Sequence, residues 1–453
     1  MSTRIDMPRR REQGLTLVEL LVAMVLGLLV TGGIITVFIS TSASNKAQQQ
    51  MARLQEDGRF AVALLSRDIG MANGQYCSGS GGNAAPSDAG PYLDQLRAPM
   101  VYANGSNNPL IQALGDVTTT WGNPYPAKPD APFMIPEFLS MRGYDCSKTN
   151  CTPVDPSTQL PGIPASGTAI GDRAVGTSIL TLRYLDPSMG WDIGRPGGSY
   201  IDAGTTGELS QIHLSPLAGE PAVGKFGKNS LAMLANCSNA QVFAVKGQGS
   251  ATLEPTGQNF SEPSAMSGTA VLRLFDFDRA YKTVTYYVKV IDDGNGHKTG
   301  ALIRRVNGND DDKGGEEQEM VRGIERLDFR YGVLDHQGKT RFFTANEIDT
   351  GTDASGNAIT CPSTVAIPAD KNNTRGCLWR AVKSIEADLV MNGQIPLHSL
   401  TETELAYTYA GDDIHTPELP DQHTIQPDTD QGFPRNLLRR EFTALIAVRS
   451  YNP

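Results

Sequence analysis

A single carboxylate, Glu19, interrupts the only long apolar stretch of this 453-residue chain, residues 15–39. An ionisable side chain at the centre of a bilayer costs at least ~2.5–3.5 kcal/mol, so residues of this kind usually have a function. Such a carboxylate is tolerated when it meets a positive charge. We therefore regard Glu19 as a candidate functional residue, and the alternative is that it snorkels to the membrane surface from a simple anchor.

Other chemistry-bearing residues do not assemble into a recognisable catalytic motif. The chain has no G-x-S-x-G, P-loop, HExxH or dinucleotide fingerprint, and its six histidines are scattered. Asp349 and Asp353 alternate with other oxygen donors around a glycine, which makes them a calcium candidate, although ordinary turn chemistry is the preferred interpretation. We predict no enzymatic activity, no cofactor and no other metal site.

Six cysteines all follow the apolar run, and an even count on one side of a membrane segment is typical of an oxidising compartment. Two pairs would close short loops, Cys146 with Cys151 and Cys361 with Cys377. Cys77 and Cys237 would then be left for each other. Free buried thiols are the alternative, whereas zinc is disfavoured because no CxxC occurs.

Composition and charge bound the remaining possibilities. The chain carries a net charge of −10, and no basic face is evident beyond its first residues, so nucleic-acid binding is not expected. Residues 1–14 carry four arginines against two acids, which would keep this end cytoplasmic. Residues 15–39 would span roughly 37 Å as a helix, enough to cross a bilayer. An ordinary signal peptide cleaved near Ala43 is the alternative.

The N-terminal residues resemble a specific class of signal. A basic leader, Gly14, and then Leu-Thr-Leu-Val-Glu looks like the class III signal of type IV prepilins and type II secretion pseudopilins. The resemblance implies cleavage after Gly14 by a membrane prepilin peptidase and N-methylation of Leu15, where most members have Phe. It also implies that Glu19 pairs with the N-terminal amine of a neighbouring subunit.

The helix is predicted to continue past the membrane segment. Apolar or small residues recur every three to four positions from residue 51 to residue 69, and no proline occurs between residues 15 and 70. We therefore expect one helix over residues 15–75, transmembrane over 15–39 and then laid on a globular head. Residues 53–72 resemble the corresponding helix of PilW-type minor pilins. The charged side chains there, Asp68 among them, have a simpler interpretation as a solvated face.

The remainder divides into two predicted parts. Residues 76–165 are rich in Gly, Ser, Asn and Pro, and we interpret them as a loop-rich inserted lobe carrying specific recognition. Residues 166–453 are predicted to form a β-rich head. Its expected strands are 177–185, 208–215, 230–237, 240–246, 270–277, 283–291, 301–306, 322–335, 378–391 and 440–450. The fold class is thus α+β and pilin-like.

The order of the later segments also resembles the PilW family. The family features are a strand ending in LRY, a Tyr-Tyr hairpin leading to an Arg-Arg strand, an IExLxFxYG strand and a closing RRxFT strand. The implied protein is a minor pilin, anchored in the inner membrane by a single pass with a periplasmic head. It would join other minor pilins and the major pilin to prime type IV pilus assembly, with a place in the filament or at its tip.

Three alternatives remain open. A type II secretion pseudopilin would share the leader. A membrane-anchored periplasmic hydrolase or ligand-binding protein would need a convergent pocket in the head. A tip adhesin for twitching motility or surface attachment is compatible with the minor-pilin interpretation.

Overall fold

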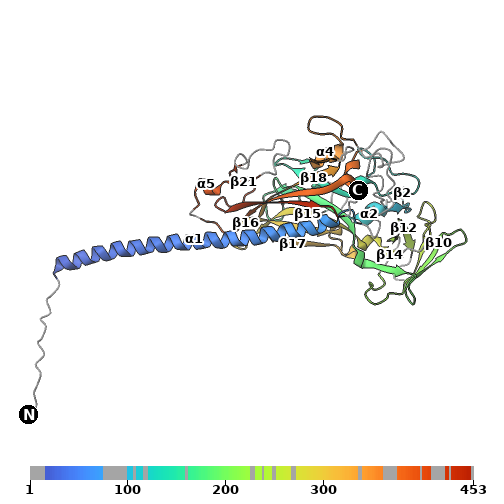
Figure 1. Cartoon of the computed structure of the whole chain (residues 1–453), viewed down its shortest axis with the longest axis horizontal. Helices are drawn as coiled ribbons and strands as arrows, with labels where there is room; N and C mark the ends of the chain where they lie inside the picture. The colour runs from blue at the N-terminus through green and yellow to red at the C-terminus, as the bar shows by residue number, and fades with distance from the viewer. Residues whose placement is uncertain are drawn as a thin grey trace, which may run out of the picture.

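The computed structural model describes most of the chain from Thr16 onward. The described residues are 16–74, 99–105, 109–115, 121–158, 162–224, 230–236, 239–246, 251–266, 272–334, 339–360, 375–397, 400–409, 424–427 and 430–449. They form one long helix and a β-rich head, the α+β layout expected of a pilin-like protein (Figure 1).

Helix α1 runs without interruption from Leu17 to Met71, a length of 55 residues. Its first half projects away from the head, and its second half lies along the head (Figure 1). The predicted periodicity is confirmed, because Leu54, Gly58, Ala61, Leu65 and Ile69 are all buried. Ala72 caps the end of the helix, and its amide donates a hydrogen bond to the carbonyl of Ile69.

Two sheets form the part of the head nearest α1, which contacts β7, β17, β20 and β23. A four-stranded antiparallel sheet has the order β19 (Thr340–Phe343), β18 (Ile324–Leu334), β20 (Val382–Asn392), β23 (Arg439–Ala447). The second sheet has the path β17 (Glu316–Arg322), β16 (Lys298–Val306), β15 (Tyr281–Asp292), β7 (Ile179–Leu185), β3 (Met141–Cys146), β4 (Cys151–Thr152), with β5 (Ser166–Gly167) and β6 (Arg173–Ala174) beside β15.

A third sheet forms the end of the head farthest from the projecting helix (Figure 1). Its path is β8 (Gly190–Ile193), β14 (Leu272–Asp276), β11 (Ser230–Ala235), β12 (Ala240–Lys246), β13 (Thr252–Pro255), β10 (Leu209–His213), β9 (Tyr200–Ala203). The strands β1 (Met100–Val101) and β2 (Phe133–Met134) extend it from β12. A bridge between Ile193 and Ser199 joins the two ends of the path, so this sheet curls almost closed.

Short elements complete the head. The small helices are α2 (Pro109–Leu114), α3 (Phe277–Ala280), α4 (Ala345–Thr350) and α5 (Glu402–Leu405), and β21 (Tyr407–Thr408) pairs with β22 (Thr424–Ile425). Single 3₁₀ turns occupy Glu137–Leu139, Pro156–Thr158, Pro187–Met189, Asn307–Asn309, Asp311–Lys313 and Cys377–Ala381.

The distal sheet has a core of its own and also shares the main core. On β11, Ala232 and Leu234 face the distal core, whereas Leu231 and Met233 belong to the main core. The side chains of β12 and β14 likewise alternate between the distal core and the main core. Strands buried on both faces read as continuous apolar runs, which explains the sequence SLAMLA of β11. The two cores are therefore joined through common strands.

All ten predicted strands are present, with their ends moved by a few residues. The predicted hairpin is confirmed in register, since β15 pairs with β16 from Val284–Val306 to Asp292–Lys298.

The separate inserted lobe over residues 76–165 stays a prediction. Strand β3 lies inside a sheet, paired with β7, and Leu110, Phe138 and Leu139 join the main core. Short apolar groups here alternate with Gly, Pro and Asn, and long-range pairing orders them. The distal sheet combines the strands β8 to β14 with β1 and β2 from this range.

Candidate assembly site: the projecting helix and its junction with the head

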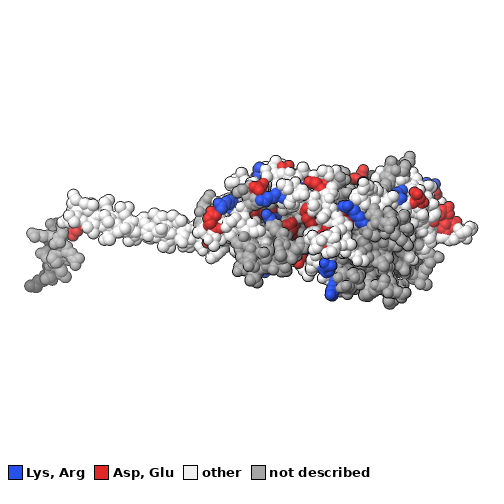
Figure 2. All heavy atoms as spheres, turned by 90° about the horizontal axis from the view of Figure 1, so that it is seen from above, with Lys and Arg blue, Asp and Glu red and all other residues white. Residues whose placement is uncertain are grey.

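The first half of α1 has no partner within the described chain. Every residue from Thr16 to Ile39 is exposed, including large apolar side chains such as Leu17 (75%) and Phe38 (72%). Figure 2 shows this stalk as almost entirely uncharged, with acidic atoms near its N-terminal tip. An exposed apolar surface of this size requires lipid or other apolar helices around it. The span is long and apolar enough to cross a membrane.

Glu19 lies in the first turn of the helix and closes a capping box with Thr16. The backbone nitrogen and the hydroxyl of Thr16 donate to Glu19 Oε2 at 3.0 and 2.9 Å, and the amide of Glu19 donates to Thr16 Oγ1 at 3.3 Å. These bonds satisfy amides that the start of a helix leaves free. Sequence reasoning missed this role, although the pattern Thr-x-x-Glu before an apolar run signals it. The predicted pairing with a neighbour's amine remains a prediction, and Gly14 and Leu15 lie outside the described residues.

A close contact fixes the second half of α1 to strand β23. A Cβ atom built on Gly58 would clash with the ring of Phe442, so only glycine allows the ring to pack this closely. Phe442 belongs to the RRxFT segment, and it explains why a glycine lies in the helix at this position. The helix loses up to about 1 kcal/mol in propensity at such a position, and the partly buried ring packs against the space that the glycine leaves.

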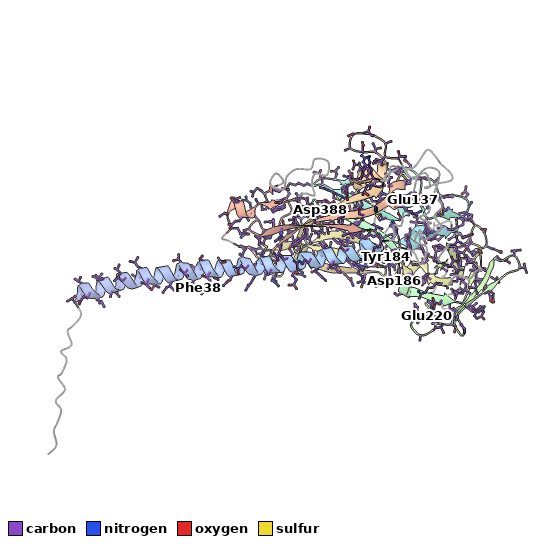
Figure 3. The ribbon with its side chains drawn as sticks, in the orientation of Figure 1. Phe38, Glu137, Tyr184, Asp186, Glu220 and Asp388 are labelled. Atoms are coloured by element: carbon purple, nitrogen blue, oxygen red, sulfur yellow. A yellow bond between two sulfur atoms is a disulfide. The ribbon has the colours of Figure 1, made fainter. Side chains whose placement is uncertain are left out.

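A polar cluster holds the end of α1 against the second sheet. The Asp68 carboxylate accepts from the hydroxyls of Tyr184 and Tyr286 at 3.0 and 2.7 Å. Arg304 Nε donates to Asp68 Oδ2 at 2.6 Å. Figure 3 shows Tyr184 beside the C-terminal end of α1. Burial, and secondarily the Asp68 charge, raise the pKa of both tyrosines, so their hydroxyls remain donors.

This cluster corrects the interpretation of Asp68 as a solvated residue, because only 2% of it is exposed. It also gives a physical role to three features of the family resemblance. Tyr184 ends the LRY strand, Tyr286 opens the Tyr-Tyr pair, and Arg304 opens the Arg-Arg pair. Tyr286 and Arg304 are direct cross-strand partners, so the hairpin presents both to the helix. Spacing along the chain could not show that the three converge on one carboxylate.

A second buried ion pair joins the remaining family segments. Glu325 of β18 accepts from Arg439 Nε of β23 at 2.6 Å and from Asn392 Nδ2 of β20 at 2.8 Å. The strands β18, β20 and β23 are thus tied at one end by charge-assisted hydrogen bonds, which are about twice as strong as neutral ones. The glutamate of IExLxFxYG and the first arginine of RRxFT form this pair.

The cysteine predictions have different outcomes. Cys146 and Cys151 are bonded as predicted, across β3 and β4. Cys377 is also disulfide-bonded. Cys77, Cys237 and Cys361 lie outside the described residues, so the pairs 361–377 and 77–237 remain predictions.

The calcium candidate finds no support in the geometry. Asp349 is fully buried, and its two oxygens accept from Arg142 at 3.0 Å and from Arg375 at 2.9 Å. Asp353 instead caps a turn by accepting from the amides of Ser355 and Asn357. The described residues contain no group of three or more side chains suited to a metal ion. The charge of the Asp349 carboxylate is balanced by two arginines rather than by a metal ion.

Comparison with known proteins agrees with this arrangement. Residues 9–35 match the family model described as Prokaryotic N-terminal methylation motif, and residues 285–450 match the model described as Type IV Pilus-assembly protein W. No curated protein and no solved structure matches the chain. A methylation signal on an apolar helix that is laid on a β-rich head defines a membrane-anchored pilin.

The second match narrows that class. The C-terminal part of the chain resembles the PilW family, and the two matches together support a PilW-like pilin associated with the type IV pilus. The PilW match begins within β15 and ends just after β23. It therefore covers the four-stranded sheet and Arg304, whereas the curled distal sheet precedes it.

Proposed function

We propose that this protein is a minor pilin that joins other minor pilins to prime assembly of a type IV pilus, with its head at the pilus tip. The observation that carries the proposal is the fully exposed apolar half of α1, attached rigidly to the head through Gly58 and Asp68. Such a stalk is soluble only in lipid or in a bundle of similar helices. The bulky head suits a tip better than the repeating wall of a filament.

The mechanism is assembly rather than catalysis. After a prepilin peptidase cuts behind Gly14, the new N-terminus would lie within one turn of Glu19. In the isolated chain, the Glu19 carboxylate accepts from Thr16. We infer that a neighbouring pilin, a minor or the major one, supplies an amine to Glu19 and so sets the register between subunits. The anchored form would reside in the inner membrane with a periplasmic head.

Mass spectrometry of the mature protein tests the class of processing. We expect an N-terminus at Leu15 carrying one added methyl group, and a mature start near Ser44 would contradict the proposal.

Glu19→Ala should still be cleaved but should reduce surface pili, measured by shearing and immunoblotting. Thr31→Ala, in the same exposed helix, is the control. Normal piliation with Glu19→Ala would refute the charge pairing.

A type II secretion pseudopilin remains the second candidate, because the methylation match suits both systems. Disrupting the gene distinguishes them. Loss of twitching motility with normal protein secretion is expected for the pilus role, and the reverse result would favour the secretion role.

A further inference from the structure

The outer wall of the distal sheet carries an ordered polar surface. Strands β9, β10 and β13 pair so that Ile201, Ile212 and Leu253 point into the distal core. The alternate residues of these strands therefore face solvent. These outward residues are Tyr200, Asp202, Gln211, His213, Thr252 and Glu254. β10 lies at the end of the molecule opposite the stalk (Figure 1).

An open groove adjoins this wall, with a volume of about 520 Å³. Its lining combines Glu208, Gln211, Glu254, Thr256, Ser261 and Glu262. Gln211 Nε2 donates to Glu254 Oε1 at 2.9 Å, and Lys246 pairs with Glu254 Oε2 at 2.7 Å. Hydrogen bonds from Thr206 lower the pKa of Glu208, and Lys246 lowers that of Glu254. The lining thus carries three carboxylates, of which Glu254 is paired with Lys246.

A half-exposed aromatic pair lies on the same outward face of the sheet, two residues along β10 from the groove residue Gln211. Tyr200, 50% exposed, stacks on His213 with ring centroids 4.4 Å apart. His213 in turn bonds to Asp202 at 2.9 Å, which holds the ring in place. The result is a flat aromatic surface next to carboxylate, amide and hydroxyl groups.

We propose that this groove binds a hydroxyl-rich oligosaccharide that carries amino groups. Sugar hydroxyls both donate and accept, which suits a lining of carboxylates, an amide and hydroxyls. The face of a sugar ring suits the exposed ring of Tyr200, because tyrosine is large, flat and amphipathic. The excess of carboxylates is complementary to ammonium groups. Use of the groove in adhesion rests on the proposed tip location, whereas binding by the purified protein does not.

A basic peptide fits the same charge less well. A peptide adding to the sheet would need the free edge of β9, yet Ser199, immediately before β9, already bridges to Ile193. The groove lining also offers few apolar side chains, mainly Leu209, Pro255 and Pro263, to hold a peptide's apolar residues. A peptide would be bound through charge alone.

Calorimetric titration of the purified full chain in detergent tests the proposal with three probes at one ionic strength. The probes are a glucosamine tetramer, the neutral N-acetylglucosamine tetramer and tetralysine. We expect the glucosamine tetramer to bind, and both the neutral tetramer and tetralysine to bind at least roughly tenfold more weakly. Binding of tetralysine as tight as that of the cationic sugar, or no binding of either sugar, would overturn the proposal.

Variants locate the site. Tyr200→Ala, Gln211→Ala and Glu262→Gln should each weaken binding of the glucosamine tetramer by about tenfold or more. Glu316→Gln, an exposed carboxylate on β17, is the matched control and should bind normally. Unchanged binding by all three groove variants with intact thermal unfolding refutes this site. Absence of sugar binding by the wild-type protein alongside normal piliation would remove the groove proposal and leave the pilin proposal standing.

Discussion

At the scale of single residues, Asp68 links the helix to the sheets. Its buried carboxylate accepts hydrogen bonds from Tyr184, Tyr286 and Arg304. A carboxylate with three donors is stable when buried, but each donor becomes costly when the carboxylate is lost. The sequence contains all four residues, yet the three donors lie 116, 218 and 236 positions from Asp68 along the chain. Only folding reveals that they act together.

We predict that Asp68→Ala lowers the free energy of unfolding by about 3–5 kcal/mol, because it leaves Arg304 without its buried partner. Urea unfolding in detergent, followed by circular dichroism, measures the change. Adding Arg304→Met should recover part of the loss. Arg67→Ala, an exposed neighbour, should change stability by less than about 0.5 kcal/mol. An effect of Asp68→Ala no larger than this would show that the cluster does not hold the helix.

Asp276, at the end of β14, makes stability depend on pH. Burial, and then the nearby Asp278, raise its pKa to about 7. Between pH ~4 and ~7 the folded protein therefore keeps a proton that the unfolded chain releases. The stabilisation from this group is fully present below pH ~4 and is lost as pH rises through 7.

We predict that Asp276→Asn, whose side chain is neutral at every pH, is more stable than the wild type at pH 8. Its free energy of unfolding, measured with urea, should be higher by about 1–4 kcal/mol. At pH 4 the advantage should vanish. Glu316→Gln, at an exposed carboxylate, should leave the pH profile unchanged. A parallel profile for Asp276→Asn and the wild type would rule out this assignment.

At the scale of elements, α1 combines two surfaces on one helix. Its first half is apolar on every side, and its second half is apolar only along the stripe that meets the head. That stripe was predicted from periodicity, and it is confirmed because burial against a sheet demands apolar residues at helical spacing. The identity of the partner strand, β23, is a long-range property that no local pattern carries.

We predict that Gly58→Val separates α1 from β23, because its side chain would occupy the place of the Phe442 ring. The expected loss is about 1–3 kcal/mol, measured by urea unfolding. Combining it with Phe442→Ala should give less than the sum of the two losses. Gly33→Ala has no neighbour within 4 Å and serves as the control. Additive losses would show that the two residues are not in contact.

At the scale of the whole molecule, the distal sheet is built into the head rather than attached by a linker. β11, β12 and β14 place alternate side chains in the distal and the main core. Force or unfolding at one core therefore disturbs strands that belong to both. This rigidity suits a head that carries a groove at the end opposite its anchor.

We predict that both cores unfold in one transition. Trp191 reports on the distal core and Trp379 on the main core. Variants that retain one of these tryptophans, with phenylalanine at the other and at Trp121, should show the same urea midpoint by fluorescence. An earlier transition for Trp191 would show that the distal sheet unfolds independently.

The sequence by itself determined the apolar stalk, the signal around Gly14, the long helix with its buried stripe and the positions of the main strands. These features depend on local composition and periodicity, which a single chain displays. Tertiary structure alone decided the convergence on Asp68, the Gly58–Phe442 contact, the Asp349–arginine pairing and the membership of the strands β1 to β4 in the sheets. Each of these joins residues far apart in sequence, and their pairing is set by the packing of the whole chain.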